Sequence, residues 1–294
     1  MTKLNYETVN EYWRNAQPSI LGPYMMDGFG FPAAAGQLRF RAEIRIMQRL
    51  IRGLNKTGTV LDLGSGIGYW AEHFARHFEK VVAVEASAPL YEALKLRCAS
   101  FSNVETHHGD VLQFEPVGQF KLVFLGGLLM YLNQDDAIAL LRRLALSLEP
   151  GGVIVCRETT VRNGAVTREG DYQAVYRSTD TYMGIFNECG LSVVDVKKNT
   201  PYVLMQMGCE FMKKWKVVVP NRLQMISVVG HLLYYGLRLG YPWIVHVPGA
   251  CRWAYPQLTN HFFVLQLTAS VADHDPIASA ANDPASEHAI TAAD

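Results

Sequence analysis

Short apolar runs alternate with amphipathic stretches along the middle of the chain. The apolar runs have the length of strands and lie at Thr59–Leu63, Val81–Val84, Val104–His107, Phe120–Leu125 and Val153–Cys156. The stretches between them carry apolar residues at helical spacing and lie at Gly68–Phe78, Ala88–Ala99 and Asp135–Leu148. Apolar strands that are separated by helices are typical of a parallel sheet with helices on both faces.

Further elements precede and follow this alternating region. We expect helices at Tyr6–Arg14, Gln37–Gly53 and Thr179–Cys189, a sixth strand at Leu191–Val196 and a seventh strand at Asn260–Leu267. The chain then divides into an N-terminal cap, a core, an insertion between the last two strands, the last strand and a tail, at residues 1–53, 54–198, 199–258, 259–268 and 269–294. We expect the tail to be disordered, because it has too few apolar residues to offset its ordering entropy.

A glycine-rich turn follows the first strand, with the sequence Asp-Leu-Gly-Ser-Gly-Ile-Gly at residues 62–68. Glycines let the backbone turn sharply and let a ligand approach it closely. The N–H groups at the start of the following helix attract a carboxylate or a phosphate. Such a turn is a weak signal by itself, because nucleotide-dependent oxidoreductases use similar turns and glycines can also serve packing alone.

Three more features lie at the ends of later strands. Glu85 ends the second strand, where an acid can accept both hydrogen bonds of a ribose diol. Asp110 follows the third strand and can receive an adenine amino group, while Gly126 and Gly127 leave room for a ligand after the fourth. The alternatives are that Glu85 is an exposed strand-end acid and that Asp110 caps a turn. Open α/β sheets bind ligands at the carboxyl ends of their strands, so together these features predict an adenosyl ligand.

The order of these motifs resembles the class I S-adenosylmethionine-dependent methyltransferases over residues 54–158. The resemblance implies a Rossmann-like α/β fold, with a seven-stranded, mostly parallel sheet, an antiparallel last strand and helices on both faces. It also implies S-adenosylmethionine as the cofactor and methyl donor. The positions that the resemblance assigns to the cofactor are Asp62, Gly64, Ser65, Gly66, Gly68, Tyr69, Glu85, Ala86, Asp110, Val111, Leu125 and Gly126.

The N-terminal part is similar to a narrower family, the protein N-terminal α-amine methyltransferases. The similarity rests on Tyr-Trp-Arg at 12–14, Pro18, Asp-Gly-Phe-Gly at 27–30 and the approach to the first strand at 55–59. The acceptor site departs from that family, which has a tryptophan and a histidine where this chain has Gly127 and Tyr131. Tyr69 stands where the family has a cofactor-binding arginine, Glu158-Thr159 stands where it has Asp-Asn, and Arg168 replaces one acid of its peptide-binding loop.

Three side chains are candidates to orient or deprotonate the methyl acceptor: Tyr131, Glu158 and Asp171. A base is needed only if the acceptor arrives protonated. Tyr131 can instead be a packing aromatic, and Glu158 can instead pair with Arg157 or Arg177. We expect methyl transfer to a nucleophile, an amine by preference, on a small-molecule or apolar acceptor. The alternatives are a peptide N-terminus as acceptor, or a non-catalytic scaffold that binds S-adenosylmethionine.

The insertion at 199–258 is much longer than a hairpin connection requires. It is rich in aromatic residues, which suit either a lid over the acceptor or a small satellite core. Those residues are Tyr202, Phe211, Trp215, Tyr234, Tyr235, Tyr241, Trp243, Trp253 and Tyr255. Lysines at 213, 214 and 216 leave a peripheral membrane contact open, although a solvated charged face is the simpler interpretation.

Composition narrows the classes of partner. Lysine plus arginine equals aspartate plus glutamate, at 27 each, so no general attraction to nucleic acid is expected. The cysteines have no Cys-x-x-Cys spacing, which argues against a metal site. The longest apolar stretch, Met225–Leu239, is shorter than the roughly 20 residues of a membrane span. We expect a cytoplasmic enzyme, because residues 1–10 carry no apolar signal core; the oligomeric state is left open.

Overall fold

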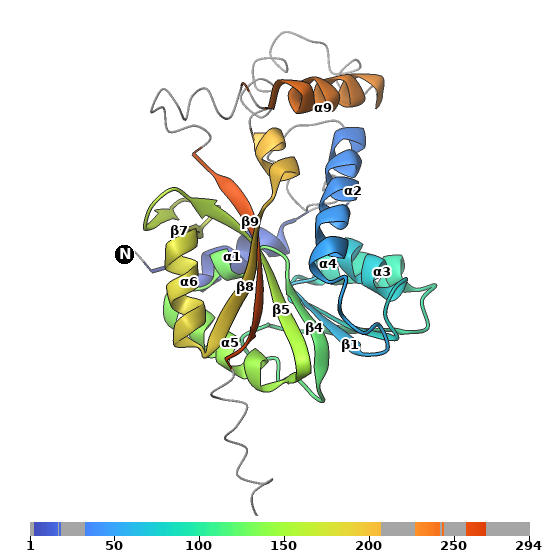
Figure 1. Cartoon of the computed structure of the whole chain (residues 1–294), viewed down its shortest axis with the longest axis vertical. Coiled ribbons are helices and arrows are strands. Elements are labelled where there is room, and N and C mark those ends of the chain that lie inside the picture. Colours follow the sequence, from blue (N-terminus) through green and yellow to red (C-terminus); the bar gives the residue numbers. More distant parts are fainter. Residues whose placement is uncertain are drawn as a thin grey trace, which may run out of the picture.

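The computed structural model describes residues 3–16, 18, 33–206, 227–241, 243 and 257–268, and nine strands of this part form one sheet (Figure 1). The central strands are, in spatial order, β3 (Val104–His108), β2 (Lys80–Glu85), β1 (Thr59–Leu63), β4 (Phe120–Leu125), β5 (Leu148–Val161), β9 (Thr259–Leu267) and β8 (Leu191–Lys198). The first five run parallel, whereas β9 is antiparallel to both of its neighbours. The predicted fold class, including the antiparallel last strand, is confirmed.

Helices cover both faces of this sheet. One face carries α5 (Gln134–Leu146) and α6 (Thr179–Glu188), and the other carries α2 (Ala33–Leu50), α3 (Tyr69–Ala75) and α4 (Ala88–Cys98). Successive side chains of a strand point to opposite faces. Leu61 and Phe263 therefore join the core under α5 and α6, while Val60 and Phe262 join the core under α2, α3 and α4.

Strand β5 is much longer than the predicted strand at Val153–Cys156. Beyond Cys156 it stays paired with β9 as far as Thr160, and it also pairs with β7 (Ala174–Ser178). β7 forms a hairpin with β6 (Ala165–Arg168), which the hydrophobic pattern did not predict. The prediction stopped early because charged residues, Arg157 and Glu158, interrupt the apolar run, although both are buried.

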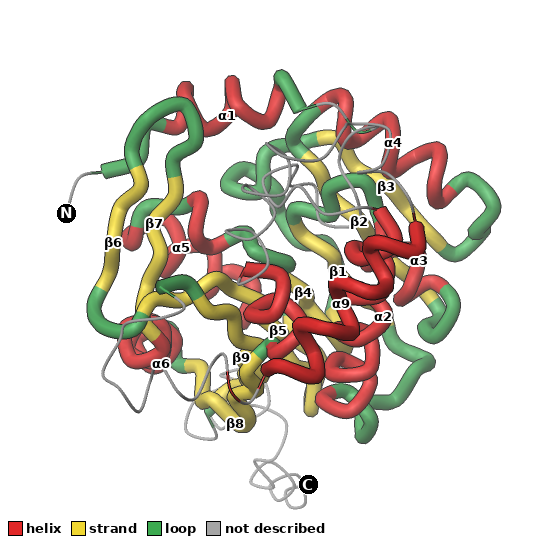
Figure 2. The backbone as a smooth tube through the Cα atoms, turned by 90° about the horizontal axis from the view of Figure 1, so that it is seen from above, coloured by secondary structure: helices red, strands yellow, loops and turns green. Residues whose placement is uncertain are grey.

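Helix α1 (Tyr6–Arg14) lies over the edge of the sheet at which the parallel strands end. Leu4 and Val9 pack on Val175 of β7, and the carbonyl oxygen of Trp13 accepts a 2.7 Å hydrogen bond from Ser87 Oγ at the start of α4. Figure 2 shows α1 running from the β6–β7 hairpin toward α4. The helix therefore encloses the side of the sheet at which a ligand is expected.

The insertion contributes two described helices, at residues 200–206 and at α9 (Ser227–Tyr241). α9 lies across the N-terminal end of α2, where Tyr234 packs with Met205 and Leu38. The predicted aromatic residues Phe211, Trp215, Trp253 and Tyr255, together with the tail, lie outside the described residues. None of the helices described here is both long enough and apolar enough to span a bilayer.

Candidate active site

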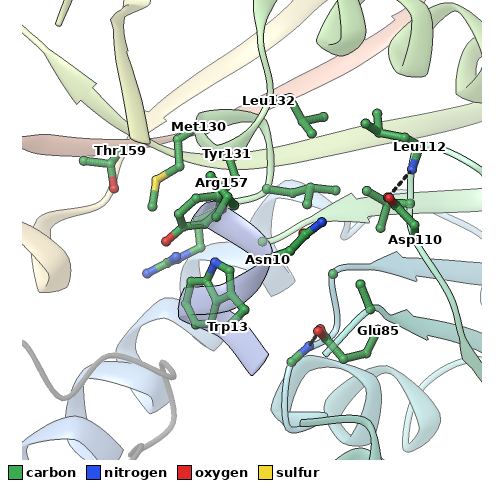
Figure 3. A pocket seen from close by; sticks show the side chains of 18 of the residues that line it. Asn10, Trp13, Glu85, Asp110, Leu112, Met130, Tyr131, Leu132, Arg157 and Thr159 are labelled. Carbon is green, nitrogen blue, oxygen red and sulfur yellow. Dashed lines mark hydrogen bonds between the residues drawn. The ribbon is translucent and has the colours of Figure 1, made fainter. Parts of the chain in front are cut away.

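A cavity of about 180 Å³, the main cavity, lies between α1 and the carboxyl ends of the parallel strands (Figure 3). Its strand-end side is lined by Gly64, Gly66, Glu85, Ala86, Asp110, Val111 and Gly126. The remaining wall is formed by Tyr6, Val9, Asn10, Trp13, Arg39, Leu112, Gly127, Leu128, Met130, Tyr131, Leu132, Arg157, Thr159 and Tyr202. Seven of the predicted cofactor positions therefore lie together on one side of this cavity.

Backbone hydrogen bonds fix the conformation of the glycine turn after β1. The N–H groups of Gly64 and Ser65 both donate to the carbonyl oxygen of Val84, at 2.9 and 3.0 Å. Gly64 and Gly66 adopt φ values of +69° and +58°, in the left-handed region that side chains disfavour. The turn therefore requires glycine at both positions, and it brings bare backbone to the cavity wall.

Glu85 is buried, so the alternative of an exposed strand-end acid is wrong. Its Oε2 accepts the N–H of Gly66 and its Oε1 accepts the N–H of Ser87, each at 2.8 Å. Burial raises the pKa of this carboxyl, and the backbone donors oppose that effect. Each carboxylate oxygen has a further lone pair, so Glu85 can hold the turn and still accept hydroxyl groups from a ligand in the main cavity.

Asp110 caps a turn and also lines the main cavity. Its Oδ1 caps the following turn by accepting the N–H of Leu112 at 2.9 Å. The same residue lines the main cavity beside Val111. A turn held in this way presents the carboxylate at a fixed position, which suits recognition of an amino group.

A second, smaller cavity of about 60 Å³, the side cavity, adjoins the glycine turn. It is lined by Asp62, Gly64, Ser65, Gly66, Ile67, Tyr69, Trp70, Phe124, Gly126 and Arg157. Asp62 is 1% exposed, and its Oδ2 has no hydrogen-bond partner among the described residues. Burial raises the pKa of this carboxyl to about 7. An unsatisfied buried acceptor is costly, and an ammonium group in the side cavity would satisfy it. The methionine end of S-adenosylmethionine supplies such a group, so this cavity fits the expected cofactor.

Two predicted cofactor positions lie outside both cavities. Gly68 begins α3 with φ +84°, and a Cβ atom there would lie only 2.7 Å from Leu94 Cδ1. Its lack of a side chain thus allows α3 to approach α4 closely. The side chain of Leu125 is fully buried in the core under α5 and α6.

Glu158, predicted as a group that orients or deprotonates the acceptor, does not line the main cavity. It lies within β5 and is fully buried, and its Oε1 accepts the N–H groups of Leu128 and Leu129 at 3.1 and 3.0 Å. Burial raises the pKa of its carboxyl to about 7. The side chain thus anchors the start of the short helix η2 (Leu129–Tyr131), which forms part of the cavity wall.

Arg157 and Arg177, the alternative ion-pair partners of Glu158, lower the pKa of its carboxyl, but their guanidinium groups donate to other acceptors. Arg177 donates instead to the carbonyl oxygens of Leu129 and Leu132, at 2.8 and 2.7 Å. Arg157 instead pairs with Glu43. Glu158 and Arg177 therefore both hold η2 through its backbone.

Tyr131 reaches the main cavity as predicted. Its hydroxyl lies 2.9 Å from the hydroxyl of Tyr172, and its ring meets that of Trp13 edge to face at 5.3 Å. Burial raises the pKa of Tyr131 well above its usual value, so the group stays a neutral phenol. Asp171, the third predicted acceptor-site residue, is exposed and lies outside the cavity lining.

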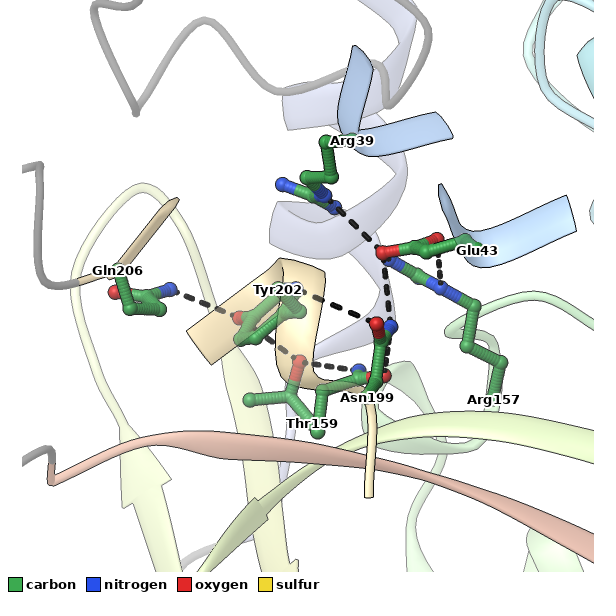
Figure 4. Close-up of polar contacts among 8 residues, drawn as sticks. Arg39, Glu43, Arg157, Thr159, Asn199, Tyr202 and Gln206 are labelled. Atoms are coloured by element: carbon green, nitrogen blue, oxygen red, sulfur yellow. Dashed lines mark hydrogen bonds and ion pairs between the residues drawn. The ribbon is translucent and has the colours of Figure 1, made fainter. Parts of the chain in front are cut away.

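A buried charged cluster beside the main cavity was not predicted (Figure 4). Glu43 Oε1 accepts Arg39 Nε at 3.1 Å and Arg157 Nη2 at 3.1 Å, while Glu43 Oε2 accepts Arg157 Nε at 2.8 Å. Burial alone raises the pKa of Glu43, but the two guanidinium groups outweigh it and hold that pKa below its usual value. Arg39 and Glu43 have helical i, i+4 spacing, which is a sequence signal, whereas Arg157 is 114 residues away.

The same cluster reaches the insertion. Asn199 Nδ2 donates to Glu43 Oε1 at 2.8 Å, and Thr159 Oγ1 donates to Tyr202 Oη at 3.1 Å. The Arg39 guanidinium lies over the Tyr202 ring at 4.9 Å. The insertion therefore forms one wall of the main cavity through Tyr202.

A family model described as AdoMet-dependent proline di-methyltransferase matches residues 2–206. The chain belongs to this family. The family's cofactor is S-adenosylmethionine, and the enzyme is a methyltransferase that uses it. The match spans α1 and the core, and it ends within the helix at residues 200–206, before α9.

Curated relatives support the same assignment at low identity. N-terminal Xaa-Pro-Lys N-methyltransferase 1-A of Xenopus laevis is 23% identical over 204 residues, which cover 66% of this chain and 87% of that protein. The Mus musculus enzyme is 26% identical over 196 residues, 64% of this chain and 85% of that protein. Phosphoethanolamine N-methyltransferase 1 of Triticum aestivum is 28% identical over 142 residues, which span only 27% of its length.

Solved structures share the fold. A SAM-dependent methyltransferase of Leishmania major superposes with a TM-score of 0.59 at 16% identity, covering 89% of this chain and 82% of that one. A complex of DhpI with SAH superposes with a TM-score of 0.53 at 24% identity, covering 66% and 90%. The methyltransferase fold therefore extends over nearly the whole described chain.

Proposed function

We propose that this enzyme methylates the nitrogen of an amine carried by a small molecule. The observation that carries the proposal is the aromatic part of the main cavity wall, where the Trp13 and Tyr131 rings meet edge to face at 5.3 Å. Among the described residues, the acids that line the cavity are Glu85 and Asp110, both on the cofactor side. The faces of aromatic rings attract cations, so this wall favours a nitrogen that gains positive charge during methylation.

The chemistry required of the protein is modest. The bound cofactor supplies a methyl group that its sulfonium already activates. The chain has to place a neutral amine in line with that group and to exclude water, and orientation of this kind can contribute on the order of 7–11 kcal/mol. In this scheme the Tyr131 hydroxyl donates a hydrogen bond to the Tyr172 hydroxyl and accepts one from an N–H of the amine. The nitrogen lone pair then faces the methyl group.

Tyr131 has the role of an orienting group in this proposal, since its raised pKa disfavours a phenolate base. Glu158 has a positioning role, because it holds the backbone that precedes Tyr131. Asp171 would contact the acceptor only if the acceptor extended out of the cavity, because this side chain is exposed outside it. The insertion would act as a lid through Tyr202, whose ring closes one side of the acceptor wall.

A protein N-terminal α-amine is the second candidate acceptor. The family match over residues 2–206 and the position of Trp13 in the cavity favour it. A peptide that begins Xaa-Pro-Lys, however, would bring a second positive charge, that of its lysine, toward Arg39 and Arg157 in the described wall, which has no acid on the acceptor side. Repulsion between like charges therefore favours the small amine over a lysine-bearing peptide.

The decisive experiment incubates the purified protein and a labelled methyl donor with a small-molecule extract and, separately, with peptides that begin Ala-Pro-Lys or Ala-Pro-Glu. We expect label in a low-molecular-weight amine, identified by mass spectrometry, and little in either peptide. Efficient labelling of the peptide that begins Ala-Pro-Lys would overturn the proposal in favour of the second candidate. A protein heated before incubation is the control for non-enzymatic transfer.

A further inference from the structure

Arg157 lies at the junction of the two cavities. It lines the main cavity and the side cavity, and it is the one basic side chain lining the side cavity within the described residues. Arg39, its neighbour in the charged cluster, lines only the main cavity. The position of Arg157 on β5, beside Gly126 and Gly127 at the end of β4, explains this difference.

The orientation of Arg157 is fixed by a carboxylate. Its Nε and Nη2 both donate to Glu43, at 2.8 and 3.1 Å, in the two-point geometry that holds a guanidinium plane still. Its Nη1 lies on the other side of the group, 3.9 Å from the point where a Cβ atom of Gly127 would sit. A side chain at position 127 would therefore lie against this nitrogen.

A methionine moiety in the side cavity needs two protein partners, an anion for its ammonium group and a cation for its carboxylate. Asp62 Oδ2 offers a buried, unpartnered acceptor for the ammonium group of the methionine moiety. In an amino acid the ammonium and the carboxylate are attached to the same carbon atom, so both enter the same small cavity. A carboxylate that is removed from water needs a charged hydrogen-bond donor.

Other basic residues near the glycine turn do not meet this need. Position 69, an arginine in the similar N-terminal α-amine methyltransferases, is a tyrosine here. Arg97 lies outside the side cavity lining: its Nε donates to the Ile67 carbonyl oxygen at 2.8 Å, and its guanidinium stacks on the Tyr69 ring at 3.6 Å. The Arg97 guanidinium thus covers the Tyr69 ring, but it does not bring its positive charge into the side cavity.

We propose that Arg157 binds the carboxylate of the cofactor's methionine moiety and that Glu43 orients it for this task. The pair lies on β5 and α2, whereas the similar family has its cofactor-binding arginine at the position of Tyr69. The inference concerns cofactor recognition and is independent of which acceptor the enzyme methylates.

The test uses two ligands that differ in the amino acid portion. S-adenosylhomocysteine has it, and methylthioadenosine lacks it. Calorimetry should show that Arg157→Met weakens S-adenosylhomocysteine binding roughly 10- to 100-fold, the range of a charged hydrogen bond, and leaves methylthioadenosine binding unchanged. Arg39→Met is the matched control, because either variant leaves Glu43 with one arginine partner, and it should change neither affinity.

Three results would overturn the proposal: an equal loss for both ligands, no loss for either ligand, or an equal effect of Arg39→Met on S-adenosylhomocysteine. Thermal melting of each variant establishes that the protein is folded. If Arg157→Met does not fold, Arg157→Lys keeps the charge and loses the planar geometry. Its ratio of affinities for the two ligands must then still fall relative to the unaltered protein, and an unchanged ratio counts against the proposal. A failed acceptor assay has no bearing on these binding measurements.

Discussion

The carboxylate of Glu85 joins the end of β2 to the glycine turn after β1, because its Oε2 accepts the backbone N–H of Gly66 at 2.8 Å. Its other oxygen accepts the N–H of Ser87, which leads into α4. One buried side chain therefore couples two adjacent strand ends and a helix start. The shape of the main cavity depends on this coupling, since the turn and the acid both line it.

Replacing Glu85 with glutamine is expected to weaken S-adenosylhomocysteine binding by about 10- to 100-fold. The amide retains one acceptor oxygen, but its NH₂ group faces donors of the turn that the carboxylate satisfied. Calorimetry measures the affinity. Glu115→Gln is the control, because that side chain is 74% exposed and does not line the cavity. Equal affinities of both variants would contradict the assignment of Glu85.

Cofactor affinity should depend on pH through Asp62. Burial raises the pKa of its carboxyl to about 7 in the ligand-free protein, whereas an ammonium partner favours the ionised form. Below pH 7, binding must therefore release a proton from Asp62. The affinity for S-adenosylhomocysteine should then fall by up to about tenfold for each unit by which the pH is lowered. Above pH 7 this dependence should level off.

The matched variant for this prediction is Asp62→Asn, which cannot titrate. It should bind more weakly at pH 8 and lose the dependence between pH 5 and 7. Calorimetry in buffers of different ionisation enthalpy also counts the released proton. A variant that retains the full pH dependence would assign the titration to another group.

Glu158→Leu should reduce the free energy of unfolding by roughly 2–4 kcal/mol, because the N–H groups of Leu128 and Leu129 lose their acceptor. Glu158→Gln keeps an acceptor oxygen and should lose much less. Urea denaturation measures both. If the glutamine variant is fully stable and binds the cofactor normally but is inactive, Glu158 acts as a base and the positioning role is wrong.

The same residue predicts a pH effect on stability. The pKa of Glu158 is raised from 4.5 in the unfolded chain to about 7 in the folded protein, so the folded state prefers the protonated acid. The stability from this group is complete below pH 4.5 and is lost as the pH rises through 7. As the pH rises from 5 to 7, the free energy of unfolding of Glu158→Gln should therefore increase relative to that of the unaltered protein. A constant difference in unfolding free energy across that interval would argue against a raised pKa.

The aromatic wall is tested with the acceptor that the labelling experiment identifies. Trp13→Leu should raise the KM for that acceptor about tenfold, through loss of a desolvated cation–π contact. Tyr131→Phe should lower kcat by about 2- to 10-fold, the range of one hydrogen bond. Neither variant should alter S-adenosylhomocysteine affinity. If both variants have unchanged kinetics, the acceptor does not contact this wall.

Local patterns in the sequence determined the parallel core and the cofactor side of the site. Alternating apolar strands and amphipathic helices permit few other arrangements, because each strand must be covered on both faces. The turn at Gly64 and Gly66 was also recognisable, since its backbone needs residues without side chains. Glu85 could be placed from its position at a strand end, because the ends of parallel strands meet at one edge.

Only the tertiary structure determined how the residues on the other side of the main cavity are arranged. Glu158 looked like a cleft residue until β5 proved to continue past it and to bury it against the backbone of η2. Arg157, Glu43 and Asn199 come from distant parts of the chain, and no spacing rule links them. Buried polar groups must find partners wherever the packed chain supplies them, and that search is long-range. Short-range periodicity therefore predicts the elements and their order, whereas the pairing of buried charges depends on how those elements finally pack.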